Sequence, residues 1–313
     1  MWGVRGGDGV RNRMTAALGK RVGGETRAED RATVPAGPDA GVDEIVVEGL
    51  SYAYPGACED ALSGVDLRFE RGRYYSLLGR NGSGKSTLAR CLNALLVPTR
   101  GTVTSCGLDT CEPLDIPDIR QRLAMVFQDP DTQIVGITVE DEVAFGPENL
   151  GLAPDVIRER VDSAMELAGI AHLAKRQPLR LSQGQKQLVA IAGALAMEPA
   201  FLISDESTSM LDHASRRRIV DLLTTLAGRG VGVIHVTHFL EEASTADEVV
   251  VLEAGRVAAV GAPAQVLADP SRVMELGLDP LPVTQVGKEL AALGHRLPGG
   301  ILTVEELLAW LRS

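Results

Sequence analysis

A glycine-rich segment, GRNGSGKST at residues 79–87, has the residue types and spacing that bind the phosphates of a nucleotide. It follows a strand-like apolar run and precedes a helix-like one, so its backbone N–H groups can point at phosphates near a helix N-terminus. Lys85 adds a charge for the β- and γ-phosphates, Ser86 a hydroxyl for Mg²⁺, and Thr87 a further hydroxyl. The segment predicts a nucleoside triphosphatase. The predicted binding residues are Gly79, Arg80, Asn81, Gly82, Ser83, Gly84, Lys85, Ser86 and Thr87.

Two carboxylates end the apolar run FLISDE at 201–206. Asp205, at the predicted strand tip, is placed to hold Mg²⁺ through water. Glu206 can polarise an attacking water, and general-base help of this kind is worth roughly 10²–10⁴-fold in rate. The pair predicts a hydrolytic centre beside the phosphate loop.

Three further residues are candidates for contact with the nucleotide. His238 closes the apolar run VGVIHVTH at 231–238 and can donate to the γ-phosphate or orient the water. Gln128 follows the run AMVF, and its amide can ligate Mg²⁺ or touch the attacking water. Tyr54, before a Pro-Gly turn, can stack on adenine, although alone Gln128 and Tyr54 also fit ordinary loop positions. His235, within the apolar run, is predicted to be a core residue without a role.

A second anion-binding motif, LSQGQ at 181–185, lies about a hundred residues downstream of the phosphate loop. Ser182 offers a hydroxyl and Gly184 an uncovered backbone at the start of a helix. The chain has one copy of each motif. We therefore expect a second chain to complete the active site.

The elements that position these motifs alternate between apolar strands and amphipathic helices, which predicts a parallel sheet wrapped by helices. A strand is expected at 45–56, and a strand pair at 65–79 that turns at Arg71-Gly72. A hairpin is expected at 103–110 and another at 248–261. Residues 138–178 are expected to be mostly helical, and a helix is expected at 214–227.

Composition narrows the class of protein. The chain has 313 residues and a net charge of −11, which argues against non-specific binding to nucleic acid. The sequence has no apolar run long enough to span a membrane. Its four cysteines form no C-x-x-C pair, so they do not indicate a zinc or redox site.

Taken together, and in this order, the motifs resemble those of an ATP-binding cassette (ABC) ATPase across roughly residues 45–262. Four segments are similar to the ATPase subunits of energy-coupling factor (ECF) importers, including the cobalt- and nickel-importer type. They are SYAYPG (51–56), VFQDPDTQI (126–134), FGPENLGL (145–152) and ESTSMLD (206–212). The tail, from ELGLDPLPVTQ to ILTVEELL, also resembles the C-terminal extension of that subgroup.

The resemblance implies an α/β fold: a P-loop NTPase (RecA-like) core with an antiparallel β subdomain, a helical signature subdomain and a small C-terminal α extension. The expected domains are a disordered extension at 1–43, an ABC ATPase domain at 44–276 with its helical subdomain at about 135–182, and the extension at 277–313.

The resemblance also implies roles for single residues. Tyr54 would stack on adenine, Gln128 would be the glutamine-loop residue, and Asp205, Glu206 and His238 would be the Walker B acid, the catalytic base and the switch histidine. The residues expected to act across a dimer interface, facing the partner's nucleotide or its surroundings, are Ser182, Gly184, Gln185 and Asp212. The chain departs from the usual family residues at Gln183, Leu188, His213 and Ser204.

The predicted function is that of an ATP-hydrolysing, Mg²⁺-dependent subunit that powers an ECF-type importer of vitamins or transition-metal ions. The expected partners are a second ATPase subunit, identical or a paralogue, an integral membrane coupling subunit and a substrate-binding membrane subunit, without nucleic acid. The expected location is peripheral, on the cytoplasmic face of the plasma membrane. The alternatives are a subunit of another ABC transporter, a non-transport ABC ATPase, and a nucleotide-binding regulatory module that does not hydrolyse.

Overall fold

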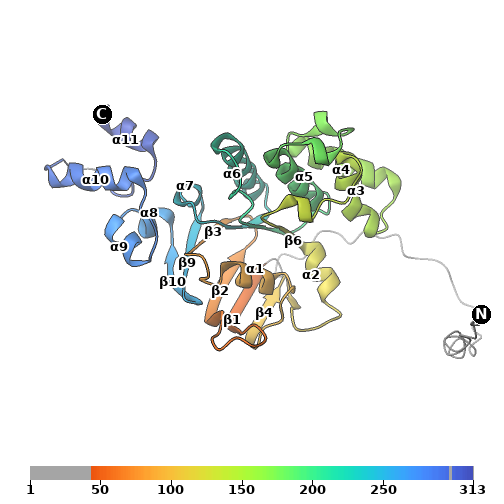
Figure 1. The fold of residues 1–313 in the computed structure, drawn as a ribbon, viewed down its shortest axis with the longest axis horizontal. Helices are drawn as coiled ribbons and strands as arrows, with labels where there is room; N and C mark the ends of the chain where they lie inside the picture. The colour runs from red at the N-terminus through yellow and green to blue at the C-terminus, as the bar shows by residue number, and fades with distance from the viewer. Residues whose placement is uncertain (1–43, 296–297, 313) are drawn as a thin grey trace, which may run out of the picture. The chain divides into compact units, whose positions relative to one another are not determined.

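The computed structural model describes residues 44–295 and 298–312 (Figure 1). The extension predicted at 1–43 lies outside the described residues. The described residues form one compact unit.

A mostly parallel sheet forms the centre of the described chain, with the strand order β10-β9-β3-β8-β7-β6. All neighbours pair in parallel except β10, which is antiparallel to β9. The carboxyl ends of β3, β6, β7 and β8 therefore meet at one edge, and each leads into a predicted functional segment. The strands are β3 (Tyr74–Leu78), β6 (Leu123–Val126), β7 (Phe201–Asp205), β8 (Gly232–Val236), β9 (Glu248–Glu253) and β10 (Arg256–Gly261).

A second, antiparallel sheet has the order β2-β1-β4-β5. The prediction that the two strands within 65–79 pair with each other is wrong. Strand β2 pairs with β1, whereas β3 lies between β8 and β9 in the other sheet. Every residue of β3 is buried, as a central parallel strand requires, whereas β2 is only partly buried. The strands are β1 (Glu44–Tyr52), β2 (Leu62–Glu70), β4 (Arg100–Ser105) and β5 (Leu108–Asp109).

Helices cover the parallel sheet and extend beyond both of its edges (Figure 1). Across residues 44–295 and 298–312, none of them is long and apolar enough to cross a bilayer. The α-helices are α1 (Lys85–Leu92), α2 (Ile116–Arg122), α3 (Val139–Asn149), α4 (Pro154–Leu167), α5 (Gln183–Leu195), α6 (His213–Gly228), α7 (Leu240–Ala243), α8 (Pro263–Leu267), α9 (Pro270–Glu275), α10 (Pro282–Ala292) and α11 (Val304–Leu311). The 3-10 helices are η1 (Pro130–Thr132), η2 (Ala171–Leu173) and η3 (Pro178–Arg180).

Alternate residues of the parallel strands enter two different cores. Leu202 and Val233 pack with residues of α3–α6 on one face of the sheet. Ile203 and Ile234 pack on the other face with α1 and the antiparallel sheet. Because successive strand side chains point to opposite faces, the sheet is buried on both sides and its carboxyl edge is held rigidly.

The C-terminal helices form a third core with one end of the sheet. Leu278, Leu281 and Leu307 pack against Val249 and Val251 of β9. In Figure 1, α8–α11 lie beyond the β10 edge, whereas α3–α5 lie near the β6 edge. Helices α8–α11 and α3–α5 thus occupy opposite ends of the sheet.

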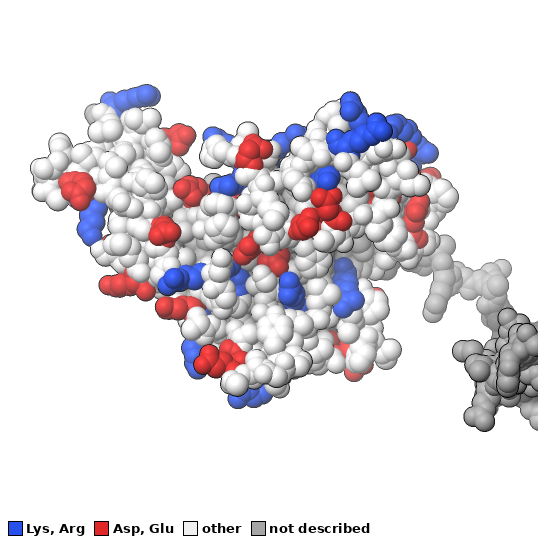
Figure 2. Space-filling model, viewed as in Figure 1, with Lys and Arg blue, Asp and Glu red and all other residues white. Residues whose placement is uncertain are grey.

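On the face shown in Figure 2, acidic and basic side chains are interspersed, and Lys and Arg gather at the upper right.

Candidate nucleotide-binding and catalytic site

The phosphate loop joins β3 to α1, as the sequence predicts. Gly84 precedes α1 with a φ of 102°, and an added Cβ would lie 2.6 Å from the Ala61 carbonyl oxygen, so a side chain would not fit.

Lys85 is buried, and its Nζ donates to the carbonyl oxygens of Gly79 at 2.8 Å and Arg80 at 3.1 Å. Burial lowers the pKa of Lys85, while the nearby Glu206 and Asp205 oppose that shift. The ammonium group is therefore held at the loop.

Ser86 and Asp205 meet at the carboxyl edge of the sheet. The Ser86 hydroxyl donates to Asp205 Oδ1 at 2.9 Å, and Asp205 is 5% exposed. Burial raises the pKa of Asp205, and the bond from Ser86 opposes this rise. A hydroxyl and one or two carboxylates are the oxygen ligands with which proteins hold Mg²⁺ together with substrate phosphates, so these residues fit that ion.

Glu206 has an unusual backbone conformation. Its φ is 50°, in the left-handed region that side-chain-bearing residues rarely adopt. Three backbone bonds fix it there: its N–H donates to the Val236 carbonyl at 3.0 Å, and the N–H and hydroxyl of Ser209 donate to its carbonyl at 3.1 and 2.9 Å. Its Oε1 lies 3.9 Å from Lys85 Nζ. Such local strain, about 1–3 kcal/mol, is typical of functional sites.

Gln128 is linked to Glu206 through Ser209, a residue that the sequence did not single out. Its Nε2 donates to Ser209 Oγ at 3.1 Å, and Ser209 in turn binds the Glu206 carbonyl. The segments after β6 and β7 are therefore joined. The sequence shows Ser209 only as one of several hydroxyl residues in ESTSMLD, so no local signal distinguishes it.

The two histidines of the β8 segment differ as predicted. His238 is exposed at the carboxyl edge, beside the end of β7, with its ring 4.0 Å from that of Phe239. His235 is fully buried, its Nδ1 lies 2.8 Å from the Tyr74 hydroxyl, and burial lowers its pKa to about 3. Only His238 is open to a nucleotide.

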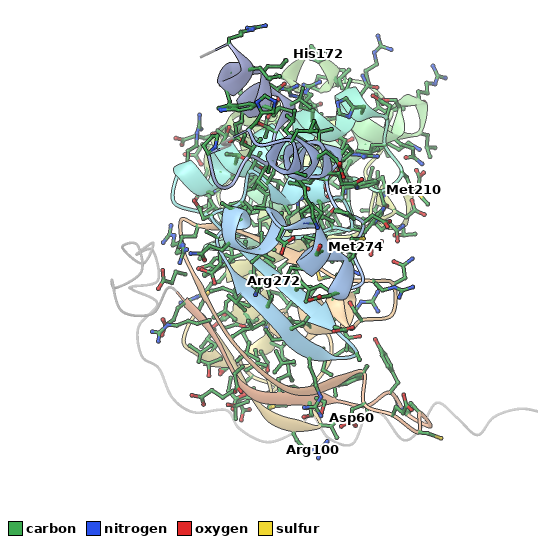
Figure 3. All side chains as sticks on the ribbon, turned by 90° about the vertical axis from the view of Figure 1, so that its left-hand side faces the viewer. Asp60, Arg100, His172, Met210, Arg272 and Met274 are labelled. Carbon is green, nitrogen blue, oxygen red and sulfur yellow. The ribbon has the colours of Figure 1, made fainter. Side chains whose placement is uncertain are left out.

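Tyr54 lies beside the phosphate loop, with its hydroxyl 3.1 Å from Thr87 Oγ1. The ring is 39% exposed, which leaves area for a base to stack. The loop that carries Tyr54 is tied to β4 by an ion pair of 2.5 Å between Asp60 and Arg100, which lie together in Figure 3.

The signature motif begins α5. Ser182 Oγ accepts from the Gln185 N–H at 3.3 Å, and Gln185 Oε1 accepts from the Ser182 N–H at 3.1 Å, which is a capping box. A Cβ on Gly184 would lie 2.7 Å from Ser215 Oγ, so glycine permits the close approach of α5 to α6. Ser182 is exposed and Gly184 is buried.

Gln183, an atypical residue for the family, has a partner within the chain. Its Nε2 donates to Asp131 Oδ2 at 3.2 Å, and Lys186 Nζ lies 2.6 Å from Asp131 Oδ1. The bond from Lys186, followed by that from Gln183, lowers the pKa of Asp131. The sequence did not reveal this link between α5 and the segment after Gln128. Leu188, where the family usually has arginine, is buried in the helical core.

The structure does not bring the signature motif to the phosphate loop. Within the described part of the chain, the side chains of Ser182 and Gln185 each accept from the other residue's backbone N–H, and the side chain of Asp212 bonds with Ser215. None of these bonds reaches residues 79–87. The predicted residues therefore separate into two groups. The first comprises Tyr54, Gly79–Thr87, Gln128, Asp205, Glu206 and His238, and the second comprises Ser182, Gly184, Gln185 and Asp212.

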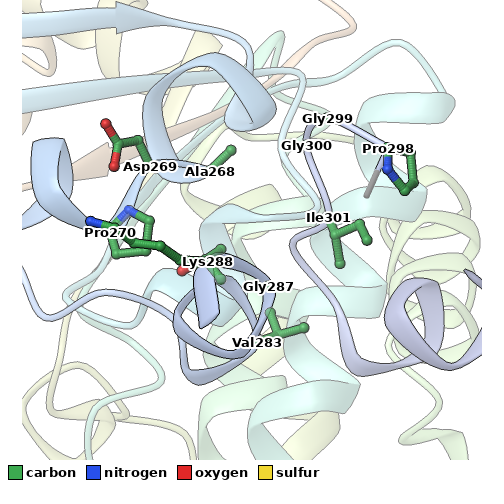
Figure 4. Close-up of a pocket in the computed structure, with 11 residues that line it drawn as sticks. Ala268, Asp269, Pro270, Val283, Gly287, Lys288, Pro298, Gly299, Gly300 and Ile301 are labelled. Carbon is green, nitrogen blue, oxygen red and sulfur yellow. The ribbon is translucent and has the colours of Figure 1, made fainter. Parts of the chain in front are cut away.

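A cavity of about 360 Å³ lies elsewhere, among the C-terminal helices α8–α10 and residues 298–301 (Figure 4). Its two charged lining residues already have partners close by. Lys288 Nζ donates to Ser271 Oγ at 2.6 Å, and Asp269 Oδ1 accepts from the Ser271 N–H at 2.9 Å. The groups suited to phosphate chemistry are at the sheet edge.

Comparison with known proteins identifies the family of the chain. The family model described as ABC transporter matches residues 62–209. The energy-coupling factor transporter ATP-binding protein EcfA1 of Symbiobacterium thermophilum is 50% identical over 272 residues, covering 84% of this chain and 95% of that protein.

Solved structures have the same fold. CbiO1 of Clostridium perfringens, described as part of the ABC transporter complex cbiONQ, has a TM-score of 0.69 at 36% identity and covers 79% of this chain and 98% of its own. The ATP-binding cassette MJ0796, as a dimer bound to ADP and Pi, has a TM-score of 0.63 at 28% identity and covers 70% and 98%.

The fold is that of an ABC-type ATPase cassette, and the chain is an ATPase that binds and hydrolyses ATP. The chain belongs to the family of energy-coupling factor transporter ATP-binding proteins.

Proposed function

We propose that this chain hydrolyses ATP at a site shared with a second cassette and so drives an ECF-type membrane importer. The observation that carries the shared site is the separation of the two residue groups. The phosphate loop, Asp205 and Glu206 are joined within the chain, whereas Ser182 and Asp212 are exposed and bond locally. A partner's signature motif would complete each site.

Each residue at the carboxyl edge of the sheet has its own role in hydrolysis. Lys85 and the loop N–H groups hold the β- and γ-phosphates, and Tyr54 stacks on the base. Ser86, Asp205 and the Gln128 side chain would hold Mg²⁺, which supplies charge neutralisation to the phosphates when bound. Glu206 accepts a proton from the attacking water, and His238 donates to the γ-phosphate. The partner's signature helix presents the hydroxyl of its serine and its N-terminal dipole to that phosphate.

ATP can favour the closed dimer only through contacts made in that state and not in the open one. The signature contact is such an interaction, because in our proposal it exists only when two chains meet. Hydrolysis removes the γ-phosphate and so releases the dimer.

Membrane partners would engage the segment from DPDTQI to FGPENL, residues 129–150, which includes α3. Val135, Ile137 and Phe145 are 65%, 77% and 50% exposed, an apolar area near the loop that binds Gln183. We propose that an integral membrane coupling subunit docks here and that a separate membrane subunit binds the vitamin or transition-metal ion. The chain would then be peripheral, on the cytoplasmic face of the membrane. The second ATPase would be an identical chain or a paralogue.

We further propose that residues 44–276 are the ATPase domain, with a helical subdomain at about 135–182, and that residues 277–313 are a C-terminal extension. The third core supports an extension that packs on β9 rather than a detached tail.

Glu206→Gln tests the proposal. The amide keeps the shape of the side chain but cannot take the proton, so ATP turnover should fall by roughly 10²–10⁴-fold. ATP affinity should persist and the dimer should accumulate, as measured by light scattering with ATP and Mg²⁺. The matched control is Glu253→Gln, at an exposed position of β9. Normal turnover of the Glu206→Gln protein would refute the assignment of the base.

A further inference from the structure

A buried carboxylate, that of Glu242 in α7, lies behind the catalytic residues and outside the groups that contact ATP. The residue is 4% exposed. Its Oε2 accepts from Thr208 Oγ1 at 3.0 Å and from Thr237 Oγ1 at 2.5 Å. Burying a carboxylate is costly unless several partners compensate, so its position calls for a specific reason.

The two threonines belong to the loops that carry the catalytic residues. Thr208 follows Glu206 after β7, and Thr237 immediately precedes His238 after β8. The Thr237 hydroxyl also accepts from the Phe239 N–H at 3.1 Å. One carboxylate oxygen therefore fixes the spacing between the two loops.

Arg216 of α6 joins the same loops from the other side. Its Nη2 donates to the Leu211 carbonyl at 3.3 Å, and its guanidinium carbon lies 3.5 Å from the centre of the Phe239 ring. The Phe239 ring in turn contacts His238. Arg216 thus links the segment that ends at Asp212 with the segment of His238.

Arg216 and Glu242 face each other across a short gap. Arg216 Nε lies 3.6 Å from Glu242 Oε1, too far for a hydrogen bond, and both atoms are buried without a hydrogen-bond partner. Besides the two threonines, His235 also lies at this carboxylate, with its Nε2 3.5 Å from Oε2. A small shift of α6 relative to α7 would close a charge-assisted bond between the Arg216 and Glu242 side chains.

We propose that Glu242, with Arg216, is a positioning residue for hydrolysis. It holds the Thr208–Asp212 segment and the Thr237–Phe239 segment in one arrangement, so that Glu206 and His238 act on the same phosphate. The inference rests on the proposed function, because it assigns Glu242 to the hydrolysis carried out by Glu206 and His238. It assigns Glu242 no contact with ATP.

The test separates the rate of hydrolysis from the binding of ATP. In the full-length protein with its partner subunits, Glu242→Gln places an amide N–H group against Arg216 and removes the charge. Misplacement of catalytic groups by about 1 Å can cost 10²-fold, so kcat should fall by roughly 10- to 100-fold. KM for ATP should stay nearly unchanged. The matched control is Glu241→Gln, on the exposed face of the same helix, which should leave kcat unchanged.

Two variants of Thr208 give a second test, with a smaller expected effect on kcat. Thr208→Val removes the donor with little change of shape and should lower kcat, whereas Thr208→Ser keeps the hydroxyl and should recover most of it. A purely structural role predicts instead that both pairs of variants change kcat only in proportion to the loss of folded protein, as measured by thermal unfolding. That result, or wild-type kcat in both Glu242→Gln and Thr208→Val, would overturn the proposal.

Glu206→Gln in the same assay separates this inference from the proposed function. If Glu206→Gln abolishes turnover while Glu242→Gln does not affect it, only the positioning role fails. If Glu206→Gln itself is fully active, the proposed site fails and the role of Glu242 fails with it.

Discussion

The phosphate loop and the signature motif are both anion-binding helix N-termini, but they differ in how complete they are within one chain. The Lys85 side chain is buried, and neighbouring carbonyls and carboxylates surround it. Ser182 is exposed, and within the described residues its hydroxyl accepts from the Gln185 backbone N–H. The contacts of Lys85 are complete within one chain, whereas we propose that a second chain meets the exposed Ser182.

This difference implies that changes in the two regions should affect different steps. Damage to the phosphate loop should remove nucleotide binding by a single chain. Damage to the signature motif should spare that binding and remove the steps that need two chains.

The largest effect is expected from Lys85→Ala, which removes the ammonium group from the phosphates. Hydrogen bonds to charged groups are worth about 1.5–3 kcal/mol, so ATP affinity should fall by roughly 10- to 100-fold in isothermal titration. Lys175→Ala is the control, because Lys175 is exposed and pairs only with Glu140 at the surface. Equal affinity of the Lys85→Ala and wild-type proteins would mean that the loop does not hold the phosphates.

Two substitutions of nearly equal size, Asp and Asn, test whether Ser182 faces the partner's γ-phosphate. Asp and Asn both cap helices well, so Ser182→Asp and Ser182→Asn should be similarly stable. Only Asp places a negative charge opposite the partner's γ-phosphate, and its turnover should fall by about tenfold or more. Binding of ATP by the single chain should not change. Equal turnover of the two variants would place Ser182 outside the shared site.

Mixing the two damaged chains sharpens the comparison. In a mixed dimer of one Lys85→Ala chain and one Ser182→Asp chain, one site has an intact phosphate loop facing an intact signature motif. Titrating one variant into the other should therefore raise ATP turnover above that of either alone. Turnover that stays at the sum of the separate variants would argue against a site shared between identical chains.

A smaller effect is expected from changes to Tyr54, which we propose stacks on the adenine base of ATP. Tyr54→Ala should weaken ATP binding by roughly tenfold, since stacking of a base on an aromatic ring is worth about 1–3 kcal/mol. Tyr54→Phe loses the contact with Thr87 but keeps the ring, so its affinity should stay close to wild type. If Phe were as damaging as Ala, the hydroxyl rather than stacking would explain the role of Tyr54.

The smallest effect is expected from Asp131→Ala, which removes the link between α5 and the segment after Gln128. The pair with Lys186 is partly exposed, and surface ion pairs contribute about 0–1 kcal/mol. ATP affinity should be unchanged and turnover should fall by less than about fivefold. A Gln183→Gly variant, which restores the usual family residue, should behave alike in a stopped-flow ATPase assay. A large loss of affinity would contradict the separation of the two regions.

The sequence predicted the motifs because each is local. A strand, a glycine loop and a helix are contiguous between residues 74 and 92, and the capping box of Ser182 needs only Gln185. The parallel sheet also followed from alternating strands and helices. The pairing of β2 with β3 was predicted wrongly, because a short turn suggests a hairpin even where the chain passes from one sheet to another.

The sequence by itself thus determined the class of chemistry, the order of the motifs and the need for a partner. The tertiary structure alone decided that Ser209 joins Gln128 to Glu206, that Asp131 binds Gln183, and that Glu242 spans the loops of Glu206 and His238. The physical reason is distance along the chain. Such contacts depend on strand order and helix packing, which no local pattern of residues specifies.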